Sequence, residues 1–253
     1  MHTAVILIAA LLAGAVNSIA GGGTLLSFPA LLWIGRNPIM ANATNAVALW
    51  PGSLAAMLGY RNDLARVQKW LLLLTLPSLA GGIIGAVLLL HTSTATFSRL
   101  VPFLILGATL LLAAQGLITS RLGLLEKAQE AKPAAGWVLF VFTFQFLVGL
   151  YGGYFGAGMG ILMLAALGLI GLTDLHEMNG LKNLLAVCIN GVAAIYFAAS
   201  GAVIWVDAIE MAAASIIGGF LGARMARKLG RVFVRRAVVV IGLSMSVALF
   251  FKR

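Results

Sequence analysis

Ala20-Gly21-Gly22-Gly23-Thr24 is the stretch that decides the fold, together with its echo at Gly156-Ala157-Gly158-Met159-Gly160. Each glycine cluster interrupts a long apolar stretch, the first from Thr3 to Gly35 and the second from Gly136 to Leu172. Both are longer than the roughly 20 residues that one membrane crossing needs. Glycine lets a backbone leave the helix, and in hydrocarbon a freed backbone must be buried or line a wet cavity. The pattern predicts two broken helices that meet at a polar spot inside a membrane protein.

The composition excludes a soluble globular protein. The chain is 62% hydrophobic and 9% charged, whereas soluble domains carry about 25% charged residues. Its long continuous apolar runs predict an all-α polytopic membrane protein in the lipid bilayer, and they do not resemble the short alternating strands of a membrane barrel. The net charge of +10 sits mostly in short loops, as the positive-inside rule expects, so we expect no nucleic-acid partner.

An internal repeat divides the chain into two halves. A shift of 137 residues superimposes special residues across the whole half, which is hard to obtain by chance. The residues that this shift pairs are Gly21 with Gly158, Gly23 with Gly160, Asn42 with Asn179, Gly81-Gly82 with Gly218-Gly219, and Arg99 with Arg236. We therefore expect a single integral membrane domain over 1–253, made of repeat 1 (1–119), a polar linker (120–133) and repeat 2 (134–253).

Each repeat is predicted to contain a glycine-broken helical hairpin followed by three transmembrane helices. The expected spans of repeat 1 are 39–59, 70–90 and 99–118. The expected spans of repeat 2 are 177–198, 204–223 and 232–251.

The charges of equivalent loops point to opposite sides of the membrane. The loop after the first span of repeat 1 carries Arg61, Arg66 and Lys69, whereas its counterpart at 200–210 has no Lys or Arg. The next loop, 91–98, has no Lys or Arg, whereas its counterpart at 224–236 has six. Opposite orientation of equivalent segments is an inverted-topology repeat. Each hairpin must then enter and return on one side, and both termini are expected outside.

The glycine breaks predict an anion site. A half-helix that starts near Thr24 would aim its N–H groups and its positive dipole end at an anion. Asn17 and Ser18 add an amide and a hydroxyl, and Gly158 and Gly160 mirror the first cluster. The alternative is that the glycines serve only close helix packing.

Polar residues also open the first full span of each repeat. Lys182 lies inside an apolar stretch, where a buried lysine is costly and usually functional, although a lysine near a helix start can also extend to the interface. Asn190 lies two turns further along on a similar face. The candidate substrate-binding residues are Asn17, Ser18, Gly21, Gly22, Gly23, Thr24, Asn42, Thr44, Asn45, Gly158, Gly160, Asn179, Lys182 and Asn183.

Patterns for catalysis are nearly absent. Gly242-Leu243-Ser244 matches the short motif of intramembrane serine proteases, but that chemistry needs a His on a neighbouring helix, and the three histidines fall at loops or ends. No cluster of Cys and His is spaced to hold zinc. We therefore expect no enzyme activity, no metal and no cofactor, and coupling to protons or sodium stays open.

The residues resemble the TauE/SafE family of sulfite exporter-like permeases over essentially the whole chain. The motifs that carry the resemblance are the glycine triplet, Pro29-Ala30-Leu31-Leu32, Gly35-Arg36-Asn37-Pro38, Ala41-x-x-Thr44-Asn45, Lys182-Asn183 and the Gly-Gly-x-x-Gly-Ala segment of each half. The resemblance implies a secondary transporter of a small anion, such as sulfite or an organosulfonate, in the bacterial inner membrane.

Together these features predict alternating access around a solute bound near the membrane midplane, between the glycine breaks and the Asn-bearing spans. The alternatives are a passive anion channel, which needs a continuous polar lining, and a membrane structural or assembly protein without transport. Substrate identity, direction of transport and assembly as a homo-oligomer stay open.

Overall fold

A computed structural model describes residues 2–19, 22–58, 68–125, 135–169, 172, 175–229 and 231–251. Over these residues the chain is helical, with no strand. The helices of the first half are α1 (His2–Ile19), α2 (Thr24–Trp33), α3 (Pro38–Leu58), α5 (Gln68–His91) and α6 (Thr94–Leu125). Those of the second half are α7 (Ala135–Tyr154), α8 (Met159–Leu169), α9 (Leu175–Ala199), α10 (Trp205–Leu229) and α11 (Arg231–Phe251).

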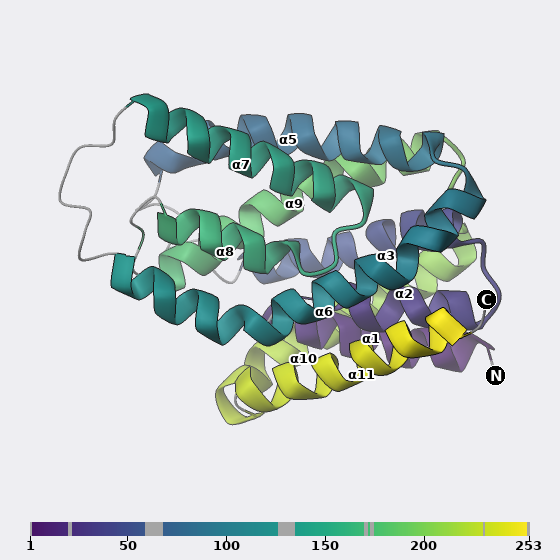
Figure 1. The fold of residues 1–253 in the computed structure, drawn as a ribbon. Coiled ribbons are helices and arrows are strands. Elements are labelled where there is room, and N and C mark those ends of the chain that lie inside the picture. Colours follow the sequence, from purple (N-terminus) through teal and green to yellow (C-terminus); the bar gives the residue numbers. More distant parts are fainter. Residues whose placement is uncertain are drawn as a thin grey trace.

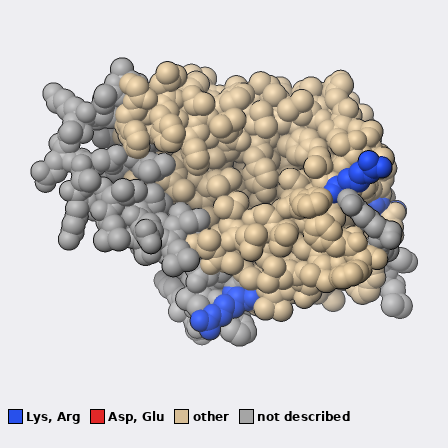
Figure 2. Space-filling view, in the orientation of Figure 1, with Lys and Arg blue, Asp and Glu red and all other residues tan. Residues whose placement is uncertain are grey.

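The helices and their surface are those of a polytopic membrane protein. Within the described residues, four helices contain a window that is long and apolar enough to cross a membrane: Leu73–His91, Thr94–Ala114, Gly180–Ala199 and Trp205–Gly222. Large apolar side chains such as Leu76, Phe103 and Ile195 are more than half exposed. In Figure 2 charged side chains of this face lie toward its ends, and none gathers across its middle. The predicted all-α polytopic membrane fold is confirmed, and the inverted orientation of its two repeats stays a prediction.

The six predicted spans correspond to α3, α5, α6, α9, α10 and α11. The helix α6 continues beyond the predicted span 99–118 to Leu125 and so includes the first residues of the predicted linker. Leu and Arg are strong helix formers, and the segment 119–125 contains no proline to stop the helix. The rest of the linker, 126–133, lies outside the described residues.

The helix boundaries follow the 137-residue shift closely. The start of α3 at Pro38 corresponds to that of α9 at Leu175, and the starts of α5 and α6 correspond in the same way to those of α10 and α11. Figure 1 shows the α5–α6 connection at the right end of the molecule and the α10–α11 connection at the left. Equivalent helices thus run in opposite directions in this view. The side of the membrane that each end faces, including the end where both termini lie, stays a prediction.

Helix α5 of the first half packs against helices of the second half, and helix α10 of the second half packs against helices of the first. Helix α1 packs along α10 of the other half, and α7 packs along α5. Glycine permits both contacts: a Cβ at Gly218 would collide with the Leu11 carbonyl of α1, and one at Gly85 with the Leu150 carbonyl of α7. Small residues allow this close backbone approach in membrane proteins. The packed units are therefore α1–α3 with α10, and α7–α9 with α5.

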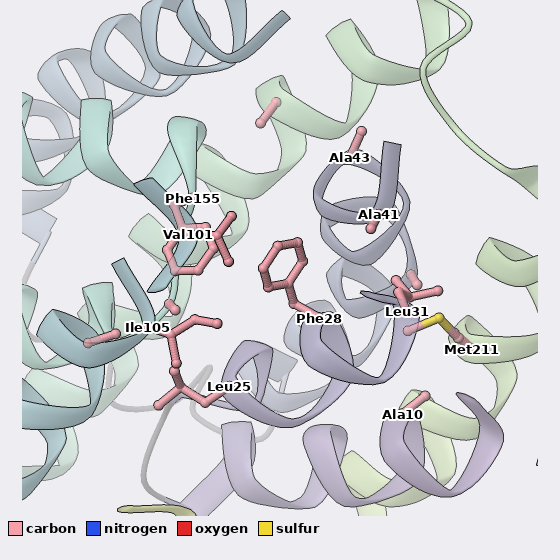
Figure 3. Packing of buried hydrophobic residues seen from close by; sticks show 14 of the residues in the cluster. Ala10, Leu25, Phe28, Leu31, Ala41, Ala43, Val101, Ile105, Phe155 and Met211 are labelled. Atoms are coloured by element: carbon pink, nitrogen blue, oxygen red, sulfur yellow. The ribbon is translucent and has the colours of Figure 1, made fainter. Parts of the chain in front are cut away.

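The second unit has a core of its own. Its buried side chains include Leu74 of α5, Val148 of α7, Met163 of α8 and Leu185 of α9. A larger cluster runs through both units and includes Leu89 of α5 and Phe197 of α9. Figure 3 shows Phe28 of α2 facing Phe155 and Val101, and the Phe28 and Phe155 rings meet edge to face with centroids 5.3 Å apart. Aromatic contacts of this geometry add to the stabilisation from burial alone.

An ion pair joins the two halves where α2 leads into α3. The Arg36 guanidinium donates from Nε to one carboxylate oxygen of Asp207 at 2.7 Å and from Nη2 to the other at 2.9 Å. The carboxylate is almost fully buried, whereas the arginine side chain is 40% exposed. A buried charge needs such a partner. The loop charges predict that Arg36 lies at the outer end, where the positive-inside rule disfavours arginine. The carboxylate of Asp207 neutralises the Arg36 charge, which explains its presence there.

Candidate functional site

A cavity of about 70 Å³ lies between the two glycine breaks and the helices α3 and α9. One water molecule needs roughly 10–15 Å³ by this measure, so the cavity has room for a small solute. From the first half it is lined by Asn17, Gly22, Thr24, Asn42, Asn45, Ala46, Leu49, Gly52 and Ser53. From the second half it is lined by Gly152, Gly153, Phe155, Gly156, Gly158, Met159, Gly160, Lys182, Asn183, Ala186 and Asn190.

The glycine breaks turn the backbone back on itself at the cavity wall. Gly22 has φ +92° and Gly158 has φ +73°, a region that L side chains rarely adopt. After these turns α2 begins at Thr24 and α8 at Met159, and both starting residues line the cavity. The N-termini of two half-helices therefore border one cavity, and each carries a positive dipole end of about half a charge.

Each break is held by a different side chain. The Asn17 Oδ1 accepts the backbone N–H of Gly23 at 2.8 Å, so this predicted ligand residue also fixes the first break. The Tyr151 hydroxyl donates to the Ala157 carbonyl at 2.6 Å and fixes the second. The Ser18 hydroxyl donates to the Ala15 carbonyl at 2.8 Å, and Ser18 is not among the lining residues.

Polar residues at the start of α3 divide into bracing and lining groups. Asn42 lines the cavity, and its Nδ2 donates to the Tyr154 carbonyl at 2.9 Å, which ties α3 to the end of α7 in the second hairpin. The fully buried Thr44 Oγ1 accepts the Ile204 N–H at 2.9 Å and does not line the cavity. Asn45 lines it, is only 2% exposed, and its Oδ1 has no hydrogen-bond partner among the described residues.

The start of α9 supplies the positive charge. Lys182 lines the cavity and is 6% exposed, so its side chain lies inside the protein. A Cβ placed on Gly160 would lie 3.4 Å from the Lys182 Cδ, and the absence of a side chain there leaves room for the lysine stem. Asn183, beside it in sequence, is 9% exposed and also lines the cavity.

The 137-residue shift relates the two long walls. Within the lining, Asn45 of α3 is equivalent to Lys182 of α9, and Ser53 to Asn190. Sequence reasoning omitted Ser53 from the candidate site, although it lies two helical turns from Asn45 and so on the same face. It also omitted Phe155, for which the sequence held no signal beyond proximity to the glycines.

Most of the predicted site residues come together. Asn17, Gly22, Thr24, Asn42, Asn45, Gly158, Gly160, Lys182 and Asn183 line the cavity. Gly23 lies at the first break as the residue before α2 but is not part of the lining. Gly21 and the side chain of Asn179 lie outside the described residues. The convergence is that of a binding cavity, and the binding role of each residue stays a prediction.

Comparisons with known proteins relate the chain to membrane transporters. The family model described as sulfite exporter TauE/SafE matches residues 6–249. A probable membrane transporter protein of Haemophilus influenzae is 30% identical, covering 93% of this chain and 89% of that protein. The probable membrane transporter proteins YfcA of Escherichia coli K12 and ORF9 of Sinorhizobium sp are 29% and 28% identical, over 98% and 97% of this chain and 89% and 91% of their own.

No solved structure matches the chain. The family match and the apolar helices together confirm a multi-pass protein of the inner membrane with the character of a permease. The match spans all but a few residues at each end, so the chain belongs to the sulfite exporter TauE/SafE family.

Proposed function

We propose that the protein is a secondary transporter of a small anion and has no enzymatic activity. One observation carries the proposal: the N-termini of α2 and α8 and the nearly buried residue Lys182 border the same cavity. Two positive dipole ends and a lysine favour negative charge. They act strongly here because a site away from water screens charge poorly.

An oxyanion is the class of solute that suits the lining. Sulfite and organosulfonates present several acceptor oxygens, and the residues that line the cavity include Thr24, Lys182 and the amide residues Asn183 and Asn190. Charge-assisted hydrogen bonds of this kind are the strong ones. The family description also names sulfite export, which supports these anions as the first to test.

Alternating access would move the two packed units against each other. The sequence predicted a motion of one repeat against the other, but α5 and α10 are exchanged between the halves. The moving bodies would then be α1–α3 with α10 and α7–α9 with α5. The cavity lies between them, lined by α3 on one side and α9 on the other. Rigid-body rocking around a central site is the usual scheme in inverted-repeat transporters.

The proposal is tested by flux in reconstituted vesicles. Radiolabelled sulfite, ethanesulfonate and acetate would be offered to vesicles with and without protein. Saturable uptake, accelerated when unlabelled anion is present on the opposite side, is the expected result. Uptake that rises linearly with concentration and shows no such acceleration would indicate a channel instead. Absence of flux of every anion, with folded protein present, would contradict transport of small anions.

The intramembrane hydrolase alternative can be tested by a substitution at Ser244. The Ser244 hydroxyl donates to the Val240 carbonyl one turn earlier at 2.9 Å, and the residue is exposed. We expect Ser244→Ala to leave flux unchanged. A loss of flux in this variant, at equal protein content, would reopen the hydrolase alternative.

A further inference from the structure

Two buried amide oxygens have no hydrogen-bond partner within the described residues. They are the Asn45 Oδ1 and the Gln145 Oε1. Both residues are at least 98% buried. Nearly all buried polar atoms in proteins have partners, so each exception calls for a reason.

Only one of the two borders the cavity. Asn45 lines it from α3, whereas Gln145 of α7 is not among the lining residues and donates from Nε2 to the Ser78 hydroxyl at 2.8 Å. Asn45 borders the cavity while its Oδ1 is covered in this conformation, so a solute in the cavity can become the partner of this oxygen once the side chain turns toward it. Gln145 then provides a control for an unpaired amide elsewhere in the protein.

Asn45 also holds a special position in the repeat. The 137-residue shift makes Asn45 of α3 equivalent to Lys182 of α9. At this shared position α3 carries a hydrogen-bond acceptor and α9 carries a cation. Lys182 and the half-helix N-termini call for acceptor oxygens on the solute. The Asn45 Oδ1 calls for the opposite, a hydrogen-bond donor.

We propose that the transported solute is a small anion that also carries a hydrogen-bond donor, a hydroxyl or an ammonium group, and that Asn45 selects for this donor. The inference rests on the proposed function and narrows it. Its anionic group would lie toward Lys182 and the starts of α2 and α8, and its donor toward the Asn45 Oδ1. An anion that lacks the donor would leave this oxygen unpaired, which is the costly arrangement.

A matched pair of sulfonates tests the donor. 2-Hydroxyethanesulfonate and ethanesulfonate differ by one hydroxyl, and their dissociation constants can be measured by titration calorimetry on the purified full-length protein. We expect the hydroxylated anion to bind roughly 10- to 100-fold more tightly to the wild type. Equal binding of the two anions would overturn the inference and leave the proposed function standing. Binding of neither anion, by protein with a cooperative thermal transition, would count against both.

Variants of Asn45 then test whether this residue causes the preference for the hydroxylated anion. Asn45→Leu removes the amide at similar size and should bring the ratio of the two constants to within about 3-fold of unity, since no oxygen is left to pair. Asn45→Asp keeps an acceptor, so it should weaken both anions through charge repulsion yet preserve their ratio. Loss of the ratio in Asn45→Asp would mean that the amide donates to the solute, and it would overturn the inference, as would an unchanged ratio in Asn45→Leu.

Gln145→Met is the matched control. It removes the other unpaired amide oxygen, together with the hydrogen bond to Ser78, and it should leave the ratio of the two dissociation constants as in the wild type. A ratio that falls equally in Gln145→Met and Asn45→Leu would show a general effect on the fold and overturn the specific role of Asn45. Each variant would be compared by its thermal transition in detergent before the titrations.

Discussion

The two long walls of the cavity, α3 and α9, share a backbone plan and differ in chemistry. Both follow a glycine-broken hairpin and both line the cavity, yet Asn45 on one wall corresponds to Lys182 on the other. The hairpin breaks differ in the same way, because Asn17 fixes the first through its amide and Tyr151 fixes the second through its hydroxyl. The repeat therefore preserves the path of the chain, while each half supplies its own polar groups to the solute and to its turns.

The ends of the molecule differ as well. The bidentate pair of Arg36 with Asp207 joins the halves at one end. The equivalent positions are Thr173 and Trp70, which cannot form an ion pair with each other. The ion pair therefore occurs at only one of two equivalent places in the repeat. Substitutions at the two ends need not have the same effect on stability. Three substitutions, in order of decreasing effect, separate the shared frame from the features of one half.

Gly218→Ala tests the shared frame and has the largest expected effect. Its Cβ would collide with the Leu11 carbonyl of α1, so the variant should lose about 3 kcal/mol or more of unfolding free energy, because backbone rather than a flexible side chain blocks the new methyl group. Gly81→Ala, at the equivalent position, meets the Phe146 carbonyl of α7 and should lose a similar amount. Thermal transitions in detergent would measure both.

Gly107→Ala in α6 is the control for these two variants. A Cβ at Gly107 meets nothing within 4 Å, so alanine there should be neutral or stabilising by up to about 1 kcal/mol from helix propensity. If Gly218→Ala melts at the temperature of Gly107→Ala, the close contact between α1 and α10 is wrong.

Arg36→Ala tests the ion pair between Arg36 and Asp207, which has no counterpart at the equivalent positions. The substitution leaves the nearly buried Asp207 carboxylate without its guanidinium, so we expect a loss of about 1–3 kcal/mol in stability. Asp207→Asn should cost less, because the half-exposed arginine that remains can be hydrated. The two variants would be compared by chemical unfolding at equal ionic strength. A larger loss in Asp207→Asn than in Arg36→Ala would contradict the burial assigned to the pair.

Tyr151→Phe tests the local difference between the breaks and has the smallest expected effect. It removes only the hydroxyl that donates to the Ala157 carbonyl, and one such hydrogen bond contributes about 0.5–1.5 kcal/mol. The equivalent residue in the first half is Gly14, so no counterpart bond exists there to compensate. Proteolysis or hydrogen exchange at the second break should increase in the variant while the first break is unchanged. Equal changes at both breaks would argue against a local role.

Much of the frame could be predicted from the sequence, because membrane spans and glycine breaks leave direct signals in hydropathy and composition. The 137-residue shift predicted which segments are equivalent. Lys182 was recognised as a lysine inside an apolar stretch, and Asn45 as one of the polar residues that open the first full span. The exchange of α5 and α10 could not be predicted. Periodicity tells which residues are apolar but not which helix packs on which, and that choice is made by backbone contacts such as Gly218 on Leu11.

The finer roles of polar residues were also beyond the sequence. Ser18 and Thr44 have the same chemical groups as cavity residues, but Ser18 bonds to its own helix and Thr44 braces the α9–α10 connection. Hydroxyl groups commonly pair with nearby backbone in this way, and only the fold decides between backbone and ligand. Phe155 lines the cavity because it lies at the second glycine break. The pattern of apolar residues in the sequence does not indicate this role.

The most direct test of the central claim is saturable flux of 2-hydroxyethanesulfonate in vesicles that hold either wild-type protein or Lys182→Ala. If Lys182 and the two half-helix N-termini bind the anion together, the wild type should show saturable flux, and the variant should lose roughly 10- to 100-fold in apparent affinity, as expected for a lost charge-assisted contact. Saturable flux with unchanged affinity in a folded Lys182→Ala protein would contradict the claim that this cavity binds the transported anion through its lysine.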